Sequence, residues 1–169
     1  MKKAIWLTGV SGVGKTTIAE SISRTHSPCF VLDADVLRGN FWPELGMSDF
    51  DRATNVIRIA KLGKLILEQV SSGIVIIACI APNYSVRTEA LKLLSTAAAT
   101  SLVHLHCNLE TRITRDPKGL YKRAIDGEIN NLTGYDGLYE IPISADLTID
   151  TGKTSIVEIR QQIMELIYE

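Results

Sequence analysis

Gly9-Val10-Ser11-Gly12-Val13-Gly14-Lys15-Thr16 is the stretch that decides the fold of this 169-residue chain. It fits G-x-x-x-x-G-K-[ST], the phosphate-binding loop of nucleoside-triphosphate enzymes. The glycines let successive backbone N–H groups converge on phosphate oxygens, and the following helix points its positive end at the same anion. Lys15 is long enough to reach the β- and γ-phosphates, and the Thr16 hydroxyl is the expected Mg²⁺ ligand. An apolar run precedes the loop and a helical pattern follows it, so we expect a working phosphate site.

Composition sets limits on the class of protein. The chain has 46% hydrophobic and 22% charged residues and a net charge of -1, which is typical of one globular domain spanning residues 1–169. The near-neutral charge gives no argument for a nucleic-acid or membrane partner. The longest apolar run, 74–81, is too short to span a bilayer. No signal peptide and no disulfide or zinc spacing is recognisable, so we expect three reduced thiols and a cytoplasmic protein.

Apolar runs alternate with helical patterns along the chain. The expected strands are 4–7, 29–32, 74–80, 102–107 and 147–149. The expected helices are 15–25, 51–70, 86–97, 109–114 and 155–168, and the stretch 115–145 is expected to be irregular. Continuous apolar strands between helices predict an α/β fold with a doubly wound parallel sheet. Ligands of such sheets bind beyond the carboxyl ends of the strands, so the segments after each strand are the candidates for chemistry.

The segment after the second expected strand carries two carboxylates and an arginine, Asp33, Asp35 and Arg38. One interpretation is a helix N-cap followed by a solvated arginine, but the position directly after a strand favours a function. Asp33 or Asp35 could accept a proton from a substrate hydroxyl or hold Mg²⁺ through water. Arg38 could bind a phosphate or sulfate through both of its terminal nitrogens.

Two further segments carry candidate anion ligands. Arg52 and Asn55 lie at the start of the second expected helix, 51–70, where they could bind a second anionic ligand or be surface residues. Arg115 and Lys118 are followed by more basic residues, and Pro117 and Gly119 interrupt the helical pattern there. We expect a loop that closes over the triphosphate and excludes water, within a lid-like segment 115–135.

With these motifs in place, the chain resembles the adenylylsulfate kinase family, P-loop enzymes that phosphorylate the 3′-hydroxyl of adenosine 5′-phosphosulfate with ATP. The most specific element is Arg115-Asp-Pro-Lys-Gly-Leu-Tyr121, followed by Gly127-Glu-Ile-Asn-Asn-Leu-Thr-Gly134. The similarity extends from the phosphate loop to Asp150-Thr151.

The resemblance implies a role for each candidate residue. ATP and Mg²⁺ would be held by Gly9, Ser11, Gly12, Val13, Gly14, Lys15, Thr16 and Thr17, with Arg115 lining the ATP side. Asp33 would be the base, and Lys15 and Lys118 would stabilise the transferred charge. The acceptor would be bound by Asp35, Arg38, Met47, Arg52, Asn55, Ile80, Lys118 and Leu132. The resemblance also implies a homodimer, a small nucleotide as acceptor and no nucleic acid.

The departures from the family pattern lie on the acceptor side. Met47 and Leu132 occupy the positions of two phenylalanines that grip the acceptor adenine in the family. Ile57 replaces one of two arginines, Val36 replaces an asparagine, and Ala81 replaces a serine, which excludes a phosphoserine there. The resemblance implies adenylylsulfate, the acceptor of sulfate assimilation, as the first candidate. The changes leave open the alternative that the reaction is kept on a different nucleotide, for example cytidine 5′-diphosphoramidate in glycan or capsule modification.

Two other classes remain as alternatives. A nucleotide-dependent switch would hydrolyse the triphosphate without an acceptor, but the chain has no Asn-Lys-x-Asp motif for reading a guanine base. A degenerate binding domain would have lost the phosphate loop, Asp33 or Lys118, and all of these are present. The sequence therefore favours a small-molecule kinase.

Overall fold

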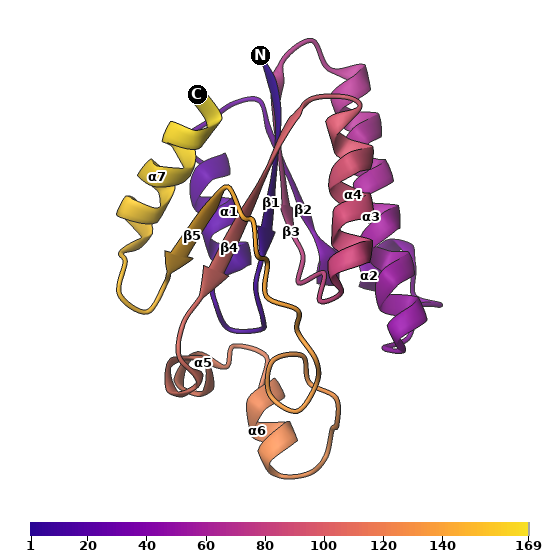
Figure 1. The fold of residues 1–169 in the computed structure, drawn as a ribbon, viewed down its shortest axis with the longest axis vertical. Helices are drawn as coiled ribbons and strands as arrows, with labels where there is room; N and C mark the ends of the chain where they lie inside the picture. Colours follow the sequence, from indigo (N-terminus) through magenta and orange to yellow (C-terminus); the bar gives the residue numbers. More distant parts are fainter. Residues whose placement is uncertain (169) are drawn as a thin grey trace.

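A computed structural model describes residues 1–168, and a parallel five-stranded sheet lies at its centre (Figure 1). The strands are β1 (Lys2–Thr8), β2 (Cys29–Asp33), β3 (Gly73–Ala78), β4 (Ala99–His106) and β5 (Leu147–Asp150). Their spatial order is β2-β3-β1-β4-β5, and each neighbouring pair is parallel. The sheet confirms the predicted α/β fold class.

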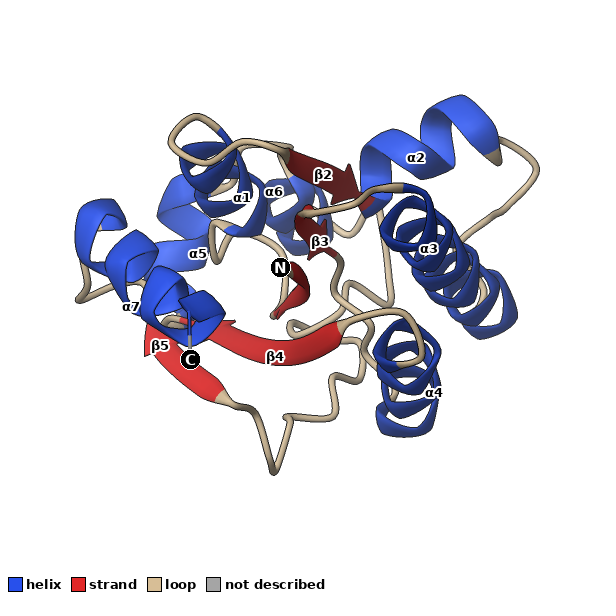
Figure 2. Cartoon of the chain, turned by 90° about the horizontal axis from the view of Figure 1, so that it is seen from above, coloured by secondary structure: helices blue, strands red, loops and turns tan. Residues whose placement is uncertain are grey.

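Helices cover both faces of the sheet (Figure 2). They are α1 (Lys15–Ser23), α2 (Ala34–Phe41), α3 (Asp49–Gln69), α4 (Tyr84–Ser95), α5 (Leu109–Arg115), α6 (Leu120–Ile125) and α7 (Ile156–Tyr168). One apolar core joins the sheet to α3 and α4, and a second joins it to α1 and α7. Because both faces are covered, every residue of β3 is buried, which explains why the strands read as continuous apolar runs.

Two helices were not predicted from the sequence. α2 contains Gly39 and Asn40, which have low helix propensity, and α6 has only six residues inside the stretch expected to be irregular. Each is started by a local signal: the Asp33 side chain accepts hydrogen bonds at the start of α2, and Gly119 precedes α6 in a left-handed conformation. The other elements differ from their expected bounds by a few residues at most.

The phosphate loop leaves β1 through a position that only glycine can occupy. Gly9 has a φ of 140°, and a Cβ atom there would lie 2.2 Å from the carbonyl oxygen of Leu105. β1 therefore turns sharply beside β4, and the loop enters α1 at the carboxyl edge of the sheet (Figure 1). Within residues 1–168, no helix is both long and apolar enough to cross a membrane.

Candidate active site

The carboxyl ends of β1, β2 and β3 bring three chain segments together. The phosphate loop follows β1, Asp33 ends β2, and Cys79 follows β3. The segment that contains α5 and α6 lies beyond the same edge of the sheet (Figure 1). This is the edge at which doubly wound proteins bind their ligands.

A cavity of about 310 Å³ lies over the phosphate loop. It is lined by Ser11, Gly12, Gly14, Lys15, Thr16, Thr17, Asp33, Ala34, Asp35, Ala78, Cys79, Ile80, Arg115, Pro117 and Lys118. The structure thus brings the phosphate-loop residues together with both carboxylates and both lid cations predicted from the sequence. Gly9 and Val13 do not line the cavity. They anchor the loop in the protein interior, since Gly9 adjoins Leu105 and Val13 is fully buried.

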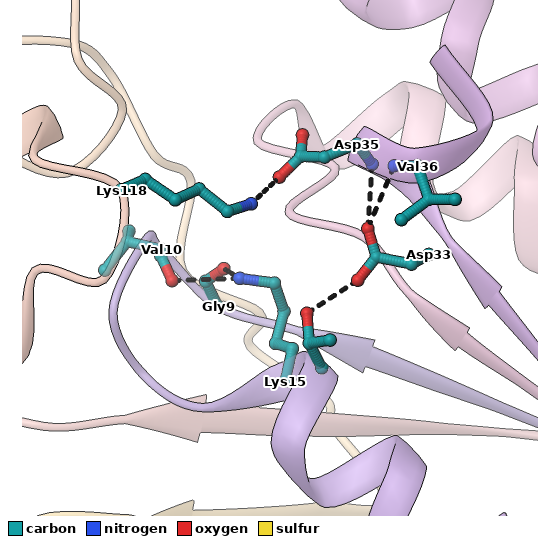
Figure 3. Close-up of polar contacts among 8 residues, drawn as sticks. Gly9, Val10, Lys15, Asp33, Asp35, Val36 and Lys118 are labelled. Carbon is teal, nitrogen blue, oxygen red and sulfur yellow. Dashed lines mark hydrogen bonds and ion pairs between the residues drawn. The ribbon is translucent and has the colours of Figure 1, made fainter. Parts of the chain in front are cut away.

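Lys15 points into the phosphate loop that carries it (Figure 3). Its ammonium donates hydrogen bonds to the carbonyl oxygens of Gly9 at 2.7 Å and Val10 at 3.0 Å. Burial lowers the pKa of Lys15 to about 8, and Cys79, Asp35 and Asp33 act in the opposite direction. A phosphate placed in the loop would supply the counter-charge that this lysine lacks.

Asp33 has two roles in the structure. One carboxylate oxygen accepts the backbone N–H groups of Asp35 at 2.9 Å and Val36 at 3.3 Å, so Asp33 is the N-cap of α2 (Figure 3). The other accepts the Thr16 hydroxyl at 2.6 Å. The prediction that Asp33 is not an N-cap was wrong, because a residue at the end of a strand can cap the next helix and still face the phosphate loop.

Lys118 and Asp35 form an ion pair across the mouth of the phosphate cavity (Figure 3). Lys118 comes from the short loop between α5 and α6, and Asp35 from the first turn of α2. Both side chains are about half exposed, so the pair can separate at little cost when an anion enters.

The breaks at Pro117 and Gly119 had predicted that Arg115 lies on a loop, and this prediction was wrong. Arg115 is the last residue of α5, and its guanidinium donates to the Thr151 carbonyl at 2.7 Å and to the Thr151 hydroxyl at 3.1 Å. Beside it lies a hollow of about 310 Å³. Its lining consists of Val13, Gly14, Thr17, Ile18, Arg115, Thr151, Thr154, Ser155, Ile156 and Ile159. The residues from Thr151 onward were not predicted to line a site, because polar residues after a strand form no distinctive motif.

A second cavity, of about 520 Å³, lies beside the phosphate cavity. Its lining consists of Ser11, Ala34, Asp35, Arg38, Met47, Arg52, Asn55, Val56, Cys79, Ile80, Pro82, Leu120, Arg123, Ile129, Asn130, Asn131, Leu132 and Thr133. All the residues predicted to bind the acceptor are among them except Lys118, which lines the phosphate cavity. Arg123, Asn130 and Thr133 were not predicted. We call this space the acceptor cavity.

Arg52 joins the start of α3 to the segment after α6. Its guanidinium donates to the Met47 carbonyl at 2.9 Å, the Asn131 carbonyl at 3.0 Å and the Thr133 hydroxyl at 2.5 Å. It therefore positions both sides of the acceptor cavity. Arg58, further along α3, pairs with Glu44 and does not line the cavity.

Asn55 is buried in the wall of the acceptor cavity. Among the described residues that line this cavity, it is the only one with a buried side-chain oxygen that accepts no hydrogen bond. It is 3% exposed, and its Oδ1 atom has no hydrogen-bond partner. Arg38 lines the same cavity and donates to the Gly46 carbonyl. A ligand that can hydrogen-bond to the Asn55 amide would remove the cost of this buried group.

Met47 and Leu132 are among the apolar residues that line the acceptor cavity, and none of the described lining residues is aromatic. Met47 is 63% exposed, whereas Leu132 is 9% exposed. A flat base would therefore meet aliphatic atoms and not ring faces. The walls of the acceptor cavity are formed by α2 and α3, by the residues that follow β3, and by α6 with the segment after it.

Together, the parallel sheet, the phosphate loop and the second cavity define the class of P-loop kinases. A family model described as adenylylsulphate kinase matches residues 1–150. The chain belongs to the adenylylsulfate kinase family and is a phosphotransferase with an alcohol group as acceptor.

Individual relatives agree with this assignment. The chain is 41% identical over 169 residues to adenylyl-sulfate kinase of Bacillus pumilus, covering 98% of this chain and 84% of the relative. It is 38% identical to the probable adenylyl-sulfate kinase of Bacillus subtilis, over 96% of this chain and 83% of that one. The structure matches the Mycobacterium tuberculosis APS kinase CysC in complex with AMPPNP and APS, with a TM-score of 0.92, 33% identity, and coverage of 99% and 98%.

Proposed function

We propose that this protein transfers the γ-phosphoryl group of ATP to the 3′-hydroxyl of adenylylsulfate, forming ADP and 3′-phosphoadenylylsulfate. The carrying observation is that the phosphate cavity and the acceptor cavity share the wall residues Ser11, Ala34, Asp35, Cys79 and Ile80. A donor phosphate and an acceptor hydroxyl can therefore meet without crossing bulk water. Phosphoryl transfer requires this positioning, together with neutralisation of charge, more than it requires covalent chemistry.

The side chains at the junction have matching chemistry. We assign Asp33, which lines the phosphate cavity, as the base that accepts the hydroxyl proton, and Asp35, which lines both cavities, is the alternative base. Lys15 and Lys118 bring positive charge to the transferred group. The nucleoside of ATP fits the hollow beside Arg115 and Thr151.

The oxygen atoms near the phosphate loop fit Mg²⁺. The Thr16 hydroxyl and the Asp33 carboxylate lie 2.6 Å apart, and both are hard ligands of the kind that Mg²⁺ binds. Within residues 1–168, no three His, Cys, Asp or Glu side chains form a metal-binding group. A Mg²⁺ ion here would take most of its ligands from phosphate oxygens and water, and it would neutralise charge on the triphosphate.

The aliphatic lining of the acceptor cavity supports a second candidate function, in which the acceptor is a different nucleotide. Base–aromatic stacking is worth about 1–3 kcal/mol per base, and Met47 and Leu132 cannot supply it. The same 3′-kinase chemistry on another nucleotide, such as cytidine 5′-diphosphoramidate, would need less stacking. A nucleotide-dependent switch is disfavoured, because the acceptor cavity would then have no use.

The deciding experiment measures ADP release with ATP and Mg²⁺ across a panel of acceptors. The panel contains adenylylsulfate, its cytidine and uridine counterparts, and nucleoside 5′-diphosphate analogues with an amide end. The highest kcat/KM with adenylylsulfate supports the main proposal, and a preference for a pyrimidine or amide analogue supports the second acceptor. ATP hydrolysis that no acceptor stimulates would contradict both.

We further propose that the enzyme is a cytoplasmic homodimer, as the family resemblance implies. The segment after α6 exposes Leu138, Ile141 and Ile143, which a second copy could cover. Light scattering with size-exclusion chromatography checks this proposal. A monomer at working concentration would contradict it.

A further inference from the structure

The four residues that follow β3, Cys79 to Pro82, have each backbone carbonyl held by a different donor. The donors are Trp6 Nε1 at 3.2 Å for Cys79, Thr8 Oγ1 at 2.6 Å for Ile80, Arg87 Nη1 at 2.7 Å for Ala81, and the Glu140 N–H at 2.9 Å for Pro82. Cys79, Ile80 and Pro82 line the acceptor cavity. Its wall is therefore fixed from behind, through backbone atoms, by residues that do not line the cavity.

Arg87 is the unusual member of this set. It is 1% exposed, it lines neither the phosphate cavity nor the acceptor cavity, and it makes no ion pair within the described chain. Burial lowers the pKa of its guanidinium. Its bonds go to two carbonyl oxygens, and it lies 5.9 Å from the ring centre of Tyr139 and 6.0 Å from that of Tyr84. The buried Arg87 guanidinium therefore holds the backbone in place and does not contact a ligand in either cavity.

The first carbonyl that Arg87 holds belongs to a strained residue. Ala81 has a φ of 45°, in the left-handed region that L-residues other than glycine disfavour. Ala81 is also 1% exposed. The hydrogen bond from Arg87 favours this conformation, and it fixes the peptide unit that leads into Pro82.

The second carbonyl that Arg87 holds belongs to Glu140, in the chain segment that forms another wall of the acceptor cavity. Arg87 Nη2 donates to the Glu140 carbonyl at 2.9 Å, and the neighbouring Tyr139 hydroxyl lies 3.0 Å from Thr8 Oγ1. Glu140 ends the segment 131–140, which also carries Leu132 and Thr133 of the acceptor cavity. One guanidinium therefore joins the wall after β3 to the wall after α6.

We propose that Arg87 is a positioning residue for the acceptor: by holding Ala81 and Glu140 together, it sets the spacing of the two walls between which the acceptor binds. The proposal rests on the proposed function, which assigns the acceptor to this cavity. Cys79 and Ile80 line both cavities, but only the acceptor cavity has lining residues from the segment 131–140. We therefore expect the spacing to affect acceptor binding more than ATP binding.

The test compares Arg87→Lys, Arg87→Met and the matched control Arg24→Met, whose side chain is 77% exposed in a surface ion pair. In Arg87→Met, we expect the acceptor KM to rise by about tenfold or more, because two charge-assisted bonds are lost. We expect the KM for ATP to change by less than about twofold. The acceptor KM of Arg87→Lys should lie between those of the wild type and Arg87→Met, because one ammonium group cannot replace a guanidinium that donates to two carbonyl oxygens. Equal changes in both KM values, or no change in either, would overturn the proposal.

Hydrogen exchange without any acceptor provides a second measurement, using Arg87→Lys in case Arg87→Met does not fold. The Glu140 N–H donates to Pro82, and the Tyr84 N–H donates to the Glu140 carboxylate. We expect faster exchange at both amides and unchanged exchange in α1. Uniform acceleration across the chain would indicate a general loss of stability and would refute the positioning role. If no acceptor is turned over by the wild-type enzyme, the proposed function fails, and this measurement still decides whether Arg87 joins the two walls.

Discussion

Thr16 and Asp33 are joined by a hydrogen bond of 2.6 Å between the threonine hydroxyl and one carboxylate oxygen. The bond links the phosphate loop to the end of β2, 17 residues further along the chain. The other oxygen of the same carboxylate caps α2. A substitution at Asp33 must therefore be chosen so that a loss of chemistry is separated from a loss of structure.

Asp33→Asn is expected to keep the fold and ATP binding and to lose turnover. Asparagine is as good an N-cap as aspartate, so the free energy of unfolding should change by less than about 1 kcal/mol. The amide cannot accept the acceptor proton, so kcat should fall about 10²- to 10⁴-fold. Steady-state kinetics and thermal unfolding of Asp33→Asn and Asp33→Ala check this prediction. Equal loss of ATP binding and turnover in Asp33→Asn would point to a metal or folding role instead.

ATP affinity is expected to fall as the pH rises above about 8, the pKa to which burial lowers Lys15. The protonated lysine binds the phosphates, so its deprotonation in the free enzyme competes with binding, with a loss of up to about tenfold per pH unit. Proton uptake should accompany binding at about pH 8–9.5, measured by calorimetry in buffers of different ionisation enthalpy. The Cys79 thiol does not interfere, because burial raises its pKa to about 12.

Lys15→Ala provides the matching control for this pH dependence. The variant should lose ATP use almost entirely, because the β- and γ-phosphates lose their cation. Its residual nucleotide binding should no longer take up protons near pH 8–9.5. Activity that stays within a few fold of the wild type would show that the phosphate-loop assignment is wrong.

Lys118→Ala is expected to lower kcat and leave ATP binding largely intact. Lys118 pairs with Asp35 at the rim of the phosphate cavity, where developing negative charge would attract it away from the carboxylate. Loss of one preorganised charge in an active site costs about 10²- to 10³-fold in kcat. Single-turnover kinetics separate this step from ATP binding, and Lys122→Ala, on α6, is the control for general loss of positive charge. A variant that only weakens ATP binding would assign Lys118 to the donor site.

The sequence alone was sufficient to predict the features that depend on residues close together along the chain. The strand, the glycine-rich loop and the helix that follows it are contiguous, so their geometry and the place of Lys15 and Thr16 could be predicted. The parallel sheet followed from the alternation of apolar runs and helices. The cap made by Asp33 was also a local signal, but its position after a strand led to the wrong interpretation.

The remaining features depend on contacts between distant residues. Arg52 reaches Thr133 across 81 positions, and Arg115 reaches Thr151 across 36. No periodicity or spacing encodes which residues of α6 and of the segment after it face the acceptor, so Arg123, Asn130 and Thr133 were missed. The position of Arg87 behind the wall after β3 also requires the folded chain, because a lone arginine in a helical pattern reads as a surface residue.

The aliphatic lining of the acceptor cavity gives a prediction about substrate choice. Leu132→Phe should place a ring against the acceptor base, since Leu132 is only 9% exposed and already forms part of the wall. Each stacked base gains about 1–3 kcal/mol, which corresponds to about 5- to 150-fold in affinity. Adenine has the larger face, so the KM for adenylylsulfate should fall more than that for its cytidine counterpart. Met47→Phe is the matched comparison, and its effect should be smaller because Met47 is 63% exposed. Parallel KM measurements with both acceptors decide the matter: if Leu132→Phe changes neither KM, the base does not lie against this wall.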